Sequence, residues 1–451
     1  MFRYSLRMLS NLLYQIRSLD SMKSYFLIGN LGHANLIILK KFRDRAFVDI
    51  IRHAYKHVPY YQNMMNENGI RPDSVRGIDD LSRFPILTKD TIREQGNRLL
   101  AQNIPLSRVY RMSTGGTTGG ALTINTDRWS HSLAQAAFHR GMAWMGYSPH
   151  LTVMNLAGGS LGECPPPGIK IRFKQFLLGQ FFIPAFELDP ETVRKYVLRI
   201  QRIGPCVLIG YASALHQLSL LCQDRGLNID NVRLVLSTAE TLPQDWKLKI
   251  ASFFGCPVKC FYGSVEQNSI GFQTEEDGDY IVSDEILIIE NPTKTSRAES
   301  SSPPLLLTSL FNKAQPLIRY DLGDCGVVFP LGTLHPSRTV IKSLEGRVED
   351  QFVRKGGSRV SGAFVPHLVQ VGRLPIGRYQ LIQWDYAEFE FRYELRPNHL
   401  LHDGHRDALI RILQKHVDKS ARVEFKETTQ FILSPQKKHR VSICKVRGLN
   451  S

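Results

Sequence analysis

The segment of residues 111–124 has the composition of an anion-binding loop. It reads RMSTGGTTGGALTI, in which four glycines, three threonines and one serine lie between an arginine and a short β-like run. Glycine lets backbone N–H groups approach an anion closely, and hydroxyl groups add further donors. The loop is not a Walker motif, because it lacks the Gly-Lys-Ser/Thr ending and runs into a strand rather than a helix. A plain surface turn is the alternative, and the loop alone does not decide between the two.

Polar residues follow three predicted strands further along the chain. Strands at 206–210, 232–237 and 257–263 alternate with helices at 213–225 and around 243–255, a pattern that predicts parallel strands with helices on the faces. Ligands of open α/β sheets bind beyond the carboxyl ends of such strands. Glu240 and Glu266 come directly after two of them, in STAETL and FYGSVEQ. Helix capping would explain either glutamate singly, but both together with the glycine loop indicate a ligand site.

Two later segments carry carboxylates and an arginine. RYDLGD (319–324) is expected to set Asp321 and Asp324 in a turn, where a carboxylate could accept two ribose hydroxyls. EGRVED (345–350) supplies Arg347 and two acids next to a change in the character of the chain. A solvated turn is the alternative for each segment.

The remaining elements give the setting of these segments. Residues 1–100 are expected to be mostly helical, with Thr88 as a helix cap, and Asp127 is expected to cap a helix that runs to about Gly146. Runs at 284–291, 304–310 and 326–330 predict antiparallel strands of a second sheet. Shorter strands and an amphipathic helix at 406–417 follow a domain boundary near residues 344–350.

Composition restricts the class of protein. The chain has 451 residues, 43% hydrophobic and 22% charged, which is ordinary for a globular enzyme of two or more domains. Its net charge of +16 favours anionic partners. Nucleic acid is not expected among them, because no motif for binding nucleic acid is present. No apolar run is long enough to span a membrane, while the basic, amphipathic N-terminus leaves peripheral membrane contact open.

Seven scattered cysteines favour a reducing cytoplasm. Cys256 and Cys260 form one C-x3-C pair without a second pair nearby, so we expect core thiols rather than a zinc site.

In this order the segments resemble the adenylate-forming superfamily of acyl-CoA synthetases and adenylation domains. The resemblance is strongest to the phenylacetate–CoA ligase branch, which includes members from capsular-polysaccharide clusters. HAYKHVPYYQNMM and LSRFPILTKDTIRE, before the glycine loop, are typical of that branch. The resemblance implies an α/β fold in which residues 1–345 form a large domain, with a parallel α/β sheet and additional β-structure. Residues 346–451 would form a small, mobile α+β domain with its hinge near Glu349.

The resemblance also implies a role for each matching residue. The loop over the β- and γ-phosphates of ATP would comprise Ser113, Thr114, Gly115, Gly116, Thr117, Thr118 and Gly119. The adenine pocket would be lined by Thr238, Ala239 and Glu240, with Tyr262 stacked on the base. Glu266 would bind Mg²⁺, and Asp324 would hold the ribose hydroxyls with help from Arg347.

Two positions depart from the pattern of that superfamily. In SPQKKHRVSICK (434–445), alignment on Arg440 and Val441 makes Lys437 the adenylation lysine, with Lys438 as an adjacent rival and a basic surface strand as the alternative. The residue before the metal-binding glutamate is usually Thr or Ser, whose hydroxyl contacts the α-phosphate. Here it is Val265, which can donate no hydrogen bond and predicts less efficient adenylation.

The implied function is a cytoplasmic, AMP-forming ligase that uses ATP, Mg²⁺ and CoA. A small carboxylic acid would be activated as an acyl-adenylate with release of pyrophosphate and then transferred to the CoA thiol. One alternative is the same activation with transfer to an amine or a hydroxyl, for instance of a polysaccharide precursor. Another is a non-catalytic homologue that keeps the fold and binds nucleotide weakly.

Overall fold

The chain divides into two units. The structure, a computed structural model, describes residues 19–113, 122–148, 150–157, 175, 179–184, 193–239, 242–292, 303–345, 352–355, 359–360, 365, 369, 374–395, 399–432 and 441–446. Unit 1 comprises residues 1–112 and 123–347, and unit 2 comprises residues 113–122 and 348–451. The predicted hinge near Glu349 stays a prediction, because Glu349 lies outside the described residues.

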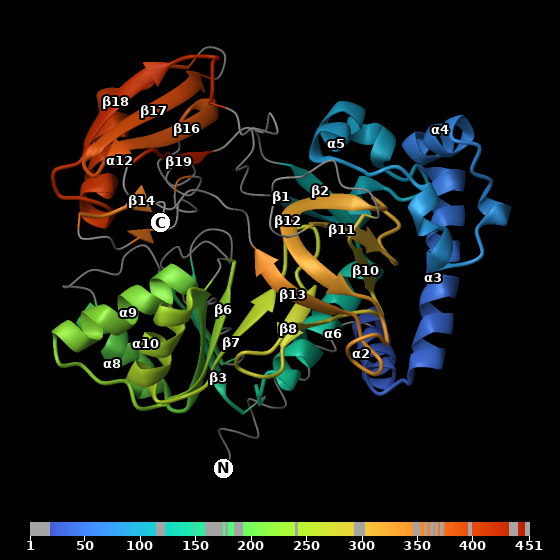
Figure 1. The fold of residues 1–451 in the computed structure, drawn as a ribbon, viewed down its shortest axis with the longest axis horizontal. Helices are drawn as coiled ribbons and strands as arrows, with labels where there is room; N and C mark the ends of the chain where they lie inside the picture. Colours follow the sequence, from blue (N-terminus) through green and yellow to red (C-terminus); the bar gives the residue numbers. More distant parts are fainter. Residues whose placement is uncertain are drawn as a thin grey trace. The chain divides into compact units, whose positions relative to one another are not determined.

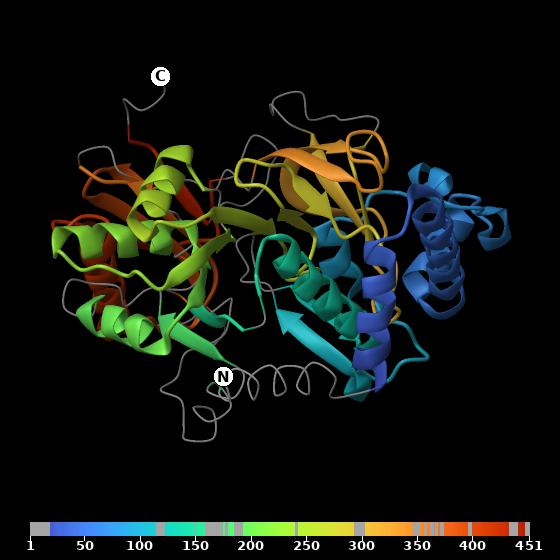
Figure 2. The ribbon, with the colours of Figure 1, turned by 90° about the horizontal axis from the view of Figure 1, so that it is seen from below.

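Helices dominate the first part of unit 1. They are α2 (Leu19–Gly32), α3 (Leu36–His57), α4 (Pro59–Glu67) and α5 (Lys89–Gln95), with short 3-10 turns at Pro72–Ser74, Ile78–Arg83, Gly96–Leu99 and Leu106–Arg108. Helix α5 begins after Thr88, whose hydroxyl accepts the backbone N–H of Thr91, so the predicted cap is confirmed. Helix α2 packs against α6 (Arg128–Trp144), and the two helices lie side by side in Figure 2.

A two-stranded sheet leads into α6. Strand β1 (Val109–Ser113) pairs with β2 (Thr123–Asp127), and the segment between them, which holds the glycine loop from Thr114 to Gly119, lies outside the described residues. Asp127 accepts the backbone N–H of Ser130 at 2.9 Å. This confirms Asp127 as the cap of α6.

The predicted strand–helix alternation forms a parallel sheet. Its strands pair in the order β4-β3-β5-β6-β7. Their bounds are β3 (Thr152–Ala157), β4 (Gln180–Pro184), β5 (Cys206–Tyr211), β6 (Val232–Thr238) and β7 (Val258–Tyr262). The connecting helices are α8 (Val193–Ile203), α9 (Ala212–Asp224) and α10 (Gln244–Phe254). The three strands and two helices expected between residues 206 and 263 are confirmed.

Helices cover both faces of this parallel sheet. On β5, Cys206 and Leu208 lie in a core with α8, α9 and α10, whereas Val207 and Ile209 lie in a core with Met142 of α6. Such alternation is expected because successive side chains of a strand point to opposite faces. Figure 1 shows α8, α9 and α10 on one side of the strands and α6 on the other.

The antiparallel strands continue the same sheet. Strand β7 pairs in parallel with β6 along one edge and antiparallel with β8 along the other, so eleven strands follow one another in the order β10-β11-β12-β13-β9-β8-β7-β6-β5-β3-β4. The added strands are β8 (Gly271–Gln273), β9 (Tyr280–Val282), β10 (Leu287–Glu290), β11 (Pro304–Ser309), β12 (Tyr320–Phe329) and β13 (Val340–Glu345). The prediction of a separate second sheet is wrong, because β7 uses both of its edges.

Unit 2 is a smaller α+β unit. Its sheet has the order β18-β17-β16-β19, and β14 (Phe352–Val353) pairs with β15 (Arg359–Val360) beside it. The strands of the larger sheet are β16 (Ile376–Asp385), β17 (Glu388–Leu395), β18 (Arg422–Glu427) and β19 (Ser442–Cys444). The predicted amphipathic helix is α12 (Asp403–His416), which packs on β18. Its Leu413 is fully buried, as is Phe391 of β17.

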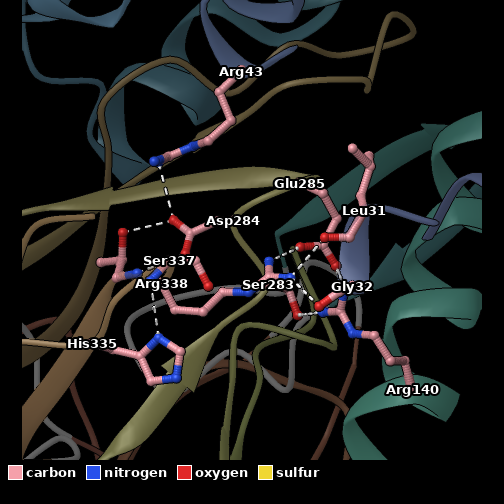
Figure 3. A network of polar contacts seen from close by, with 11 residues as sticks. Leu31, Gly32, Arg43, Arg140, Ser283, Asp284, Glu285, His335, Ser337 and Arg338 are labelled. Atoms are coloured by element: carbon pink, nitrogen blue, oxygen red, sulfur yellow. Dashed lines mark hydrogen bonds and ion pairs between the residues drawn. The ribbon is translucent and has the colours of Figure 1, made fainter. Parts of the chain in front are cut away.

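Buried charges join the lead-in helices to the sheet of unit 1 (Figure 3). Arg43 of α3 pairs with Asp284, with 3.2 Å between Nη2 and Oδ1, and Arg338 pairs with Glu285, with 2.6 Å between Nη1 and Oε2. Arg140 of α6 pairs with the same Glu285 carboxylate. Asp284 and Glu285 have no exposed surface. Loss of either carboxylate would leave buried guanidinium groups uncompensated, at a cost of about 3–5 kcal/mol.

Backbone groups complete this charge cluster. Arg338 donates to the carbonyl oxygens of Leu31 and Gly32, at the end of α2, over 2.9 and 3.1 Å. Thr339 donates its backbone N–H and its hydroxyl to the two oxygens of Asp284, at 2.7 and 2.6 Å. The cluster therefore fixes α2, α3 and α6 on one side of the sheet, which is a structural role.

Two further sequence expectations concern membranes and metals. Among the helices that the structure describes, none is both long enough and apolar enough to cross a bilayer.

Cys260 is buried and Cys256 partly buried, and burial raises the pKa of each thiol to about 11. The prediction of a core thiol is confirmed for Cys260, and the absence of a zinc site stays a prediction.

Candidate functional site

Three parallel strands end at one edge of the sheet in unit 1. Tyr211 at the end of β5 is paired with Thr238 at the end of β6, and Tyr262 ends the neighbouring strand β7. Each of these side chains is buried. Parallel strands bring their carboxyl ends to the same edge, and this edge is where open α/β sheets bind ligands.

The backbone directly after β6 is left-handed. Ala239 has a φ of 66°, in a region that costs a non-glycine residue about 1–2 kcal/mol. Such outliers cluster at ligand-binding sites, where the surrounding structure holds them in place. Ala239 is one of the residues expected to line an adenine pocket, and Glu240, the next residue, lies outside the described part of the chain.

A tight turn follows β7 and presents Val265 and Glu266. Ser264 and Gln267 exchange two backbone hydrogen bonds across it, at 2.9 and 3.2 Å, and the Ser264 hydroxyl also accepts from the Gln267 N–H. Gly263 is required at its start, because a Cβ there would lie 2.5 Å from the carbonyl oxygen of Asn268. The Ser264 hydroxyl oxygen is thus an acceptor within the turn.

Among the described residues, Glu266 is buried without a cationic partner. The residue is 7% exposed, and one carboxylate oxygen accepts a hydrogen bond from the Tyr320 hydroxyl at 2.6 Å. No lysine or arginine of the described ranges forms an ion pair with this carboxylate. A buried carboxylate is costly unless it is paired, hydrogen-bonded or bound to a metal. The environment of Glu266 therefore suits a cation that arrives with a ligand.

A second tyrosine–carboxylate bond lies close by. The Tyr262 hydroxyl donates to Asp324 of β12 at 2.7 Å, and its ring meets Tyr280 edge-on, with 6.5 Å between the ring centroids. The two hydrogen bonds run in opposite directions between the strands. The donor Tyr262 lies on β7 and its acceptor Asp324 on β12, whereas the donor Tyr320 lies on β12 and its acceptor Glu266 follows β7. Three strands separate β7 from β12 in the sheet order, but β12 is strongly bent (Figure 1) and reaches the end of β7.

The prediction that Asp321 and Asp324 lie in a turn is wrong. Both belong to β12, which begins at Tyr320. The strand is irregular there, because Gly323 has a φ of 85° and donates its N–H to Asp321 at 2.8 Å. The Asp-Leu-Gly-Asp composition is typical of turns, but strand pairing with β11 and β13 overrides it.

Several predicted site residues lie outside the described part of the chain. Ser113 ends β1, and its side chain lies outside the described part of the structure. The same holds for the whole of Thr114, Gly115, Gly116, Thr117, Thr118, Gly119, Glu240, Arg347, Lys437 and Lys438. Their predicted roles stay predictions. The structure brings together Thr238, Ala239, Tyr262, Glu266 and Asp324 around the ends of β6 and β7, and adds Tyr320, which sequence reasoning missed.

The described residues offer magnesium a single carboxylate rather than a cage. Among them no group of three or more His, Cys, Asp or Glu side chains could hold a metal ion. Mg²⁺ is commonly bound by one or two carboxylates together with substrate phosphates and water. Glu266 fits that mode of binding.

The fold is that of the adenylate-forming CoA ligases. The crystal structure of 2-hydroxyisobutyryl-CoA ligase with 2-HIB-AMP and CoA, in the thioesterification state, superimposes with a TM-score of 0.58. The superposition covers 90% of each chain at 20% identity. No protein-family model matches the sequence.

The sequence is similar to protein CapK and to phenylacetate-coenzyme A ligases. It is 23% identical to protein CapK of Staphylococcus aureus over 295 residues, which are 63% of this chain and 62% of CapK, less than two thirds of that protein. It is also 23% identical to the phenylacetate-coenzyme A ligase of Thermus thermophilus over 328 residues, 70% of this chain and 72% of that one. The resemblance inferred from the motifs is thereby confirmed.

Proposed function

We propose that this chain activates a carboxylic acid with ATP and Mg²⁺ as an acyl-adenylate and then transfers the acyl group to CoA. The observation that carries the proposal is the buried carboxylate of Glu266, which has a tyrosine donor but no cationic partner in the described ranges. The fold and the relatives named phenylacetate-coenzyme A ligase support the same assignment.

Glu266 would bind Mg²⁺ together with phosphates of ATP and water. The bound ion would neutralise negative charge on those phosphates. Tyr320 orients the carboxylate, because its hydroxyl occupies one oxygen and limits how the group can rotate.

The nucleotide would lie along the ends of β6 and β7. Tyr262 would stack on adenine beside Thr238, Ala239 and Glu240. Asp324 would accept the ribose hydroxyls, with Arg347 assisting. Asp324 already accepts the Tyr262 hydroxyl, and a carboxylate has about four acceptor positions, so both interactions can coexist.

The first half-reaction would be an in-line displacement. A carboxylate oxygen of the acid attacks the α-phosphorus of ATP, and the bond to the pyrophosphate oxygen breaks with its electron pair on the leaving group. The loop from Ser113 to Gly119 would hold the pyrophosphate, and Lys437, or its neighbour Lys438, would stabilise the charge that develops on the α-phosphate. Positioning and electrostatic stabilisation supply most of the rate in such a reaction.

The second half-reaction would form the thioester. The CoA thiolate attacks the acyl carbonyl and AMP leaves. Attack by an amine or a hydroxyl is the alternative acceptor chemistry implied by the resemblance. The net charge of +16 suits the phosphates of CoA.

Val265 supports a second candidate, a nucleotide-binding homologue with weak or absent adenylation. Valine offers no hydroxyl to the α-phosphate, and the neighbouring Ser264 hydroxyl, which accepts a hydrogen bond from the Gln267 N–H, is one residue away from that position.

Pyrophosphate release with ATP and Mg²⁺ tests the proposal. The purified chain is assayed against a panel of aromatic, short aliphatic and hydroxy acids, with Glu266→Ala and Lys437→Ala as control variants. We expect acid-dependent release that both variants abolish, after which CoA and amines are compared as acceptors. A chain that binds ATP but releases no pyrophosphate with any acid would favour the second candidate, and a chain that binds no nucleotide would refute both.

A further inference from the structure

Helices α2 and α3 carry four exposed apolar side chains that lie close together in the sequence. Thirteen large hydrophobic side chains are exposed among the described residues, and four of these lie within 17 residues of sequence. They are Met22 (48% exposed), Phe26 (74%), Ile37 (64%) and Ile38 (54%). Single exposed apolar side chains are ordinary, whereas a group of them usually marks a surface that contacts something else.

The four side chains lie on the outward faces of their helices. On α2, Met22 and Phe26 are one turn apart, and the buried Ser24 and Ile28 lie on the opposite face. On α3, Ile37 and Ile38 begin the face opposite to buried residues such as Leu39, Ala46 and Ile50. Only residues 33–35 connect the two helices, and both Figure 1 and Figure 2 show them as neighbours at one edge of unit 1.

Basic side chains outnumber acidic ones among the exposed charges of these two helices. Six exposed lysines or arginines lie on α2 and α3, against two exposed acids: Lys23, Lys40, Lys41, Arg45, Arg52 and Lys56, against Asp20 and Asp49. Lys41 and Arg45 follow Ile37 at one-turn intervals, so the charge continues the apolar face along α3. The 18 residues that precede α2 add three arginines and no acid.

We propose that this α2–α3 surface, made of Met22, Phe26, Ile37 and Ile38 with Lys23, Lys40, Lys41 and Arg45, docks on an anionic membrane surface. Apolar side chains on a helix face bordered by lysine and arginine match the boundary between acyl chains and acidic headgroups. The apolar side chains enter the interface, and the cations pair with the headgroup phosphates. This docking does not depend on the proposed ligase activity.

Flotation of the full chain with lipid vesicles tests the proposal. Vesicles of phosphatidylcholine with phosphatidylglycerol are compared with vesicles of phosphatidylcholine alone at about 0.1 M salt. At this salt concentration exposed charges still attract one another over about 10 Å. We expect the wild type to float with the anionic vesicles and to stay at the bottom with the neutral ones.

Two variants separate the apolar and the charged contributions. One carries Met22→Ser, Phe26→Ser, Ile37→Ser and Ile38→Ser, and the other carries Lys40→Glu and Lys41→Glu. Each should bind anionic vesicles at least about tenfold more weakly than the wild type. All six side chains are exposed, so thermal stability and vesicle-free pyrophosphate release should equal those of the wild type.

A matched control removes the same chemistry elsewhere. Leu248 is 61% exposed on α10 and is followed by the exposed Lys249. Leu248→Ser with Lys249→Glu should float like the wild type.

Several outcomes would overturn the proposal. The wild type could fail to bind anionic vesicles, or it could bind neutral vesicles equally well. The variant with the four serine substitutions could also bind as well as the wild type, which would mean that only charge attracts the chain to the vesicles. A wild-type dimer that the apolar variant converts to a monomer on gel filtration would assign the surface to a second copy instead.

Discussion

Replacing Tyr320 with phenylalanine removes one oxygen atom from the environment of Glu266. The donor and the acceptor are 2.6 Å apart, which is the range of a charge-assisted O–H···O⁻ bond. Tyr320 has no exposed surface and Glu266 is 7% exposed, so water does not readily replace the lost donor. A hydrogen bond to a charged group contributes about 1.5–3 kcal/mol, and we expect Tyr320→Phe to lower the free energy of unfolding of unit 1 by that amount.

Two assays follow the consequence. Urea unfolding, read by tryptophan fluorescence, reports mainly on unit 1, because Trp129, Trp144 and Trp246 lie there and Trp384 lies in unit 2. A double-mutant cycle with Glu266→Gln should give a coupling energy of about 1.5–3 kcal/mol. In the pyrophosphate-release assay, the Mg²⁺ concentration for half-maximal rate should rise about tenfold or more, since 1.4 kcal/mol corresponds to a factor of ten.

Tyr61→Phe is a matched control for the loss of a buried hydroxyl. The Tyr61 hydroxyl donates to the neutral carbonyl of Pro316 at 2.8 Å and accepts the Ile318 N–H at 3.2 Å, and Tyr61 is 1% exposed. This variant should lower stability without coupling to Glu266 and without changing the Mg²⁺ dependence. Additive effects of Tyr320→Phe and Glu266→Gln, or an equal Mg²⁺ shift in Tyr61→Phe, would refute the idea that Tyr320 positions the carboxylate.

Three other predictions concern the turn, the buried histidine and the departure at Val265. Gly263→Ala places a Cβ 2.5 Å from the Asn268 oxygen, so pyrophosphate release should fall more than about tenfold, whereas Gly404→Ala, where the Cβ meets nothing within 4 Å, should leave it unchanged. Burial lowers the pKa of His139 from 6.5 to about 4. Between these two pH values the unfolded chain binds a proton at this histidine and the folded chain does not. The free energy of unfolding should therefore fall as pH falls from 6.5 toward 4, by up to about 1.4 kcal/mol per pH unit. His139→Gln should weaken this dependence in unfolding measured at several pH values, and an unchanged slope would contradict the assignment. Val265→Thr adds a hydrogen-bond donor for the α-phosphate and should speed pyrophosphate release about tenfold in single-turnover assays. Val265→Ala should show no gain. Equal rates for the wild type and both variants would count against a role of this position in contacting the α-phosphate.

Local signals in the sequence predicted the local structure well. The helix caps at Thr88 and Asp127 and the strand–helix alternation from residue 206 to residue 263 are found as predicted, because each depends on residues within one or two turns of chain. The order of the motifs along the chain predicted the fold. That prediction rested on several weak motifs together rather than on one specific motif.

Long-range pairing could not be predicted in the same way. The second half of β12 was predicted, as the run at 326–330, but its first half was expected to be a turn. Asp, Leu and Gly form a typical turn sequence there, and only pairing with β11 makes it a strand. Tyr320 and Glu266 are 54 residues apart, and nothing in their neighbourhoods couples them. The buried ion pairs were likewise invisible, since arginine and acidic residues are usually exposed and composition cannot say which ones meet inside.

The transfer of oxygen from the acid to AMP tests the central claim most directly. An acid that supports pyrophosphate release is labelled with ¹⁸O in its carboxylate and incubated with the chain, ATP, Mg²⁺ and CoA, and the nucleotide product is examined by mass spectrometry. Attack of the carboxylate on the α-phosphorus, followed by release of AMP, predicts one ¹⁸O atom in AMP and none in the pyrophosphate. Label in inorganic phosphate, or AMP without label, would contradict adenylation as the reaction of this site.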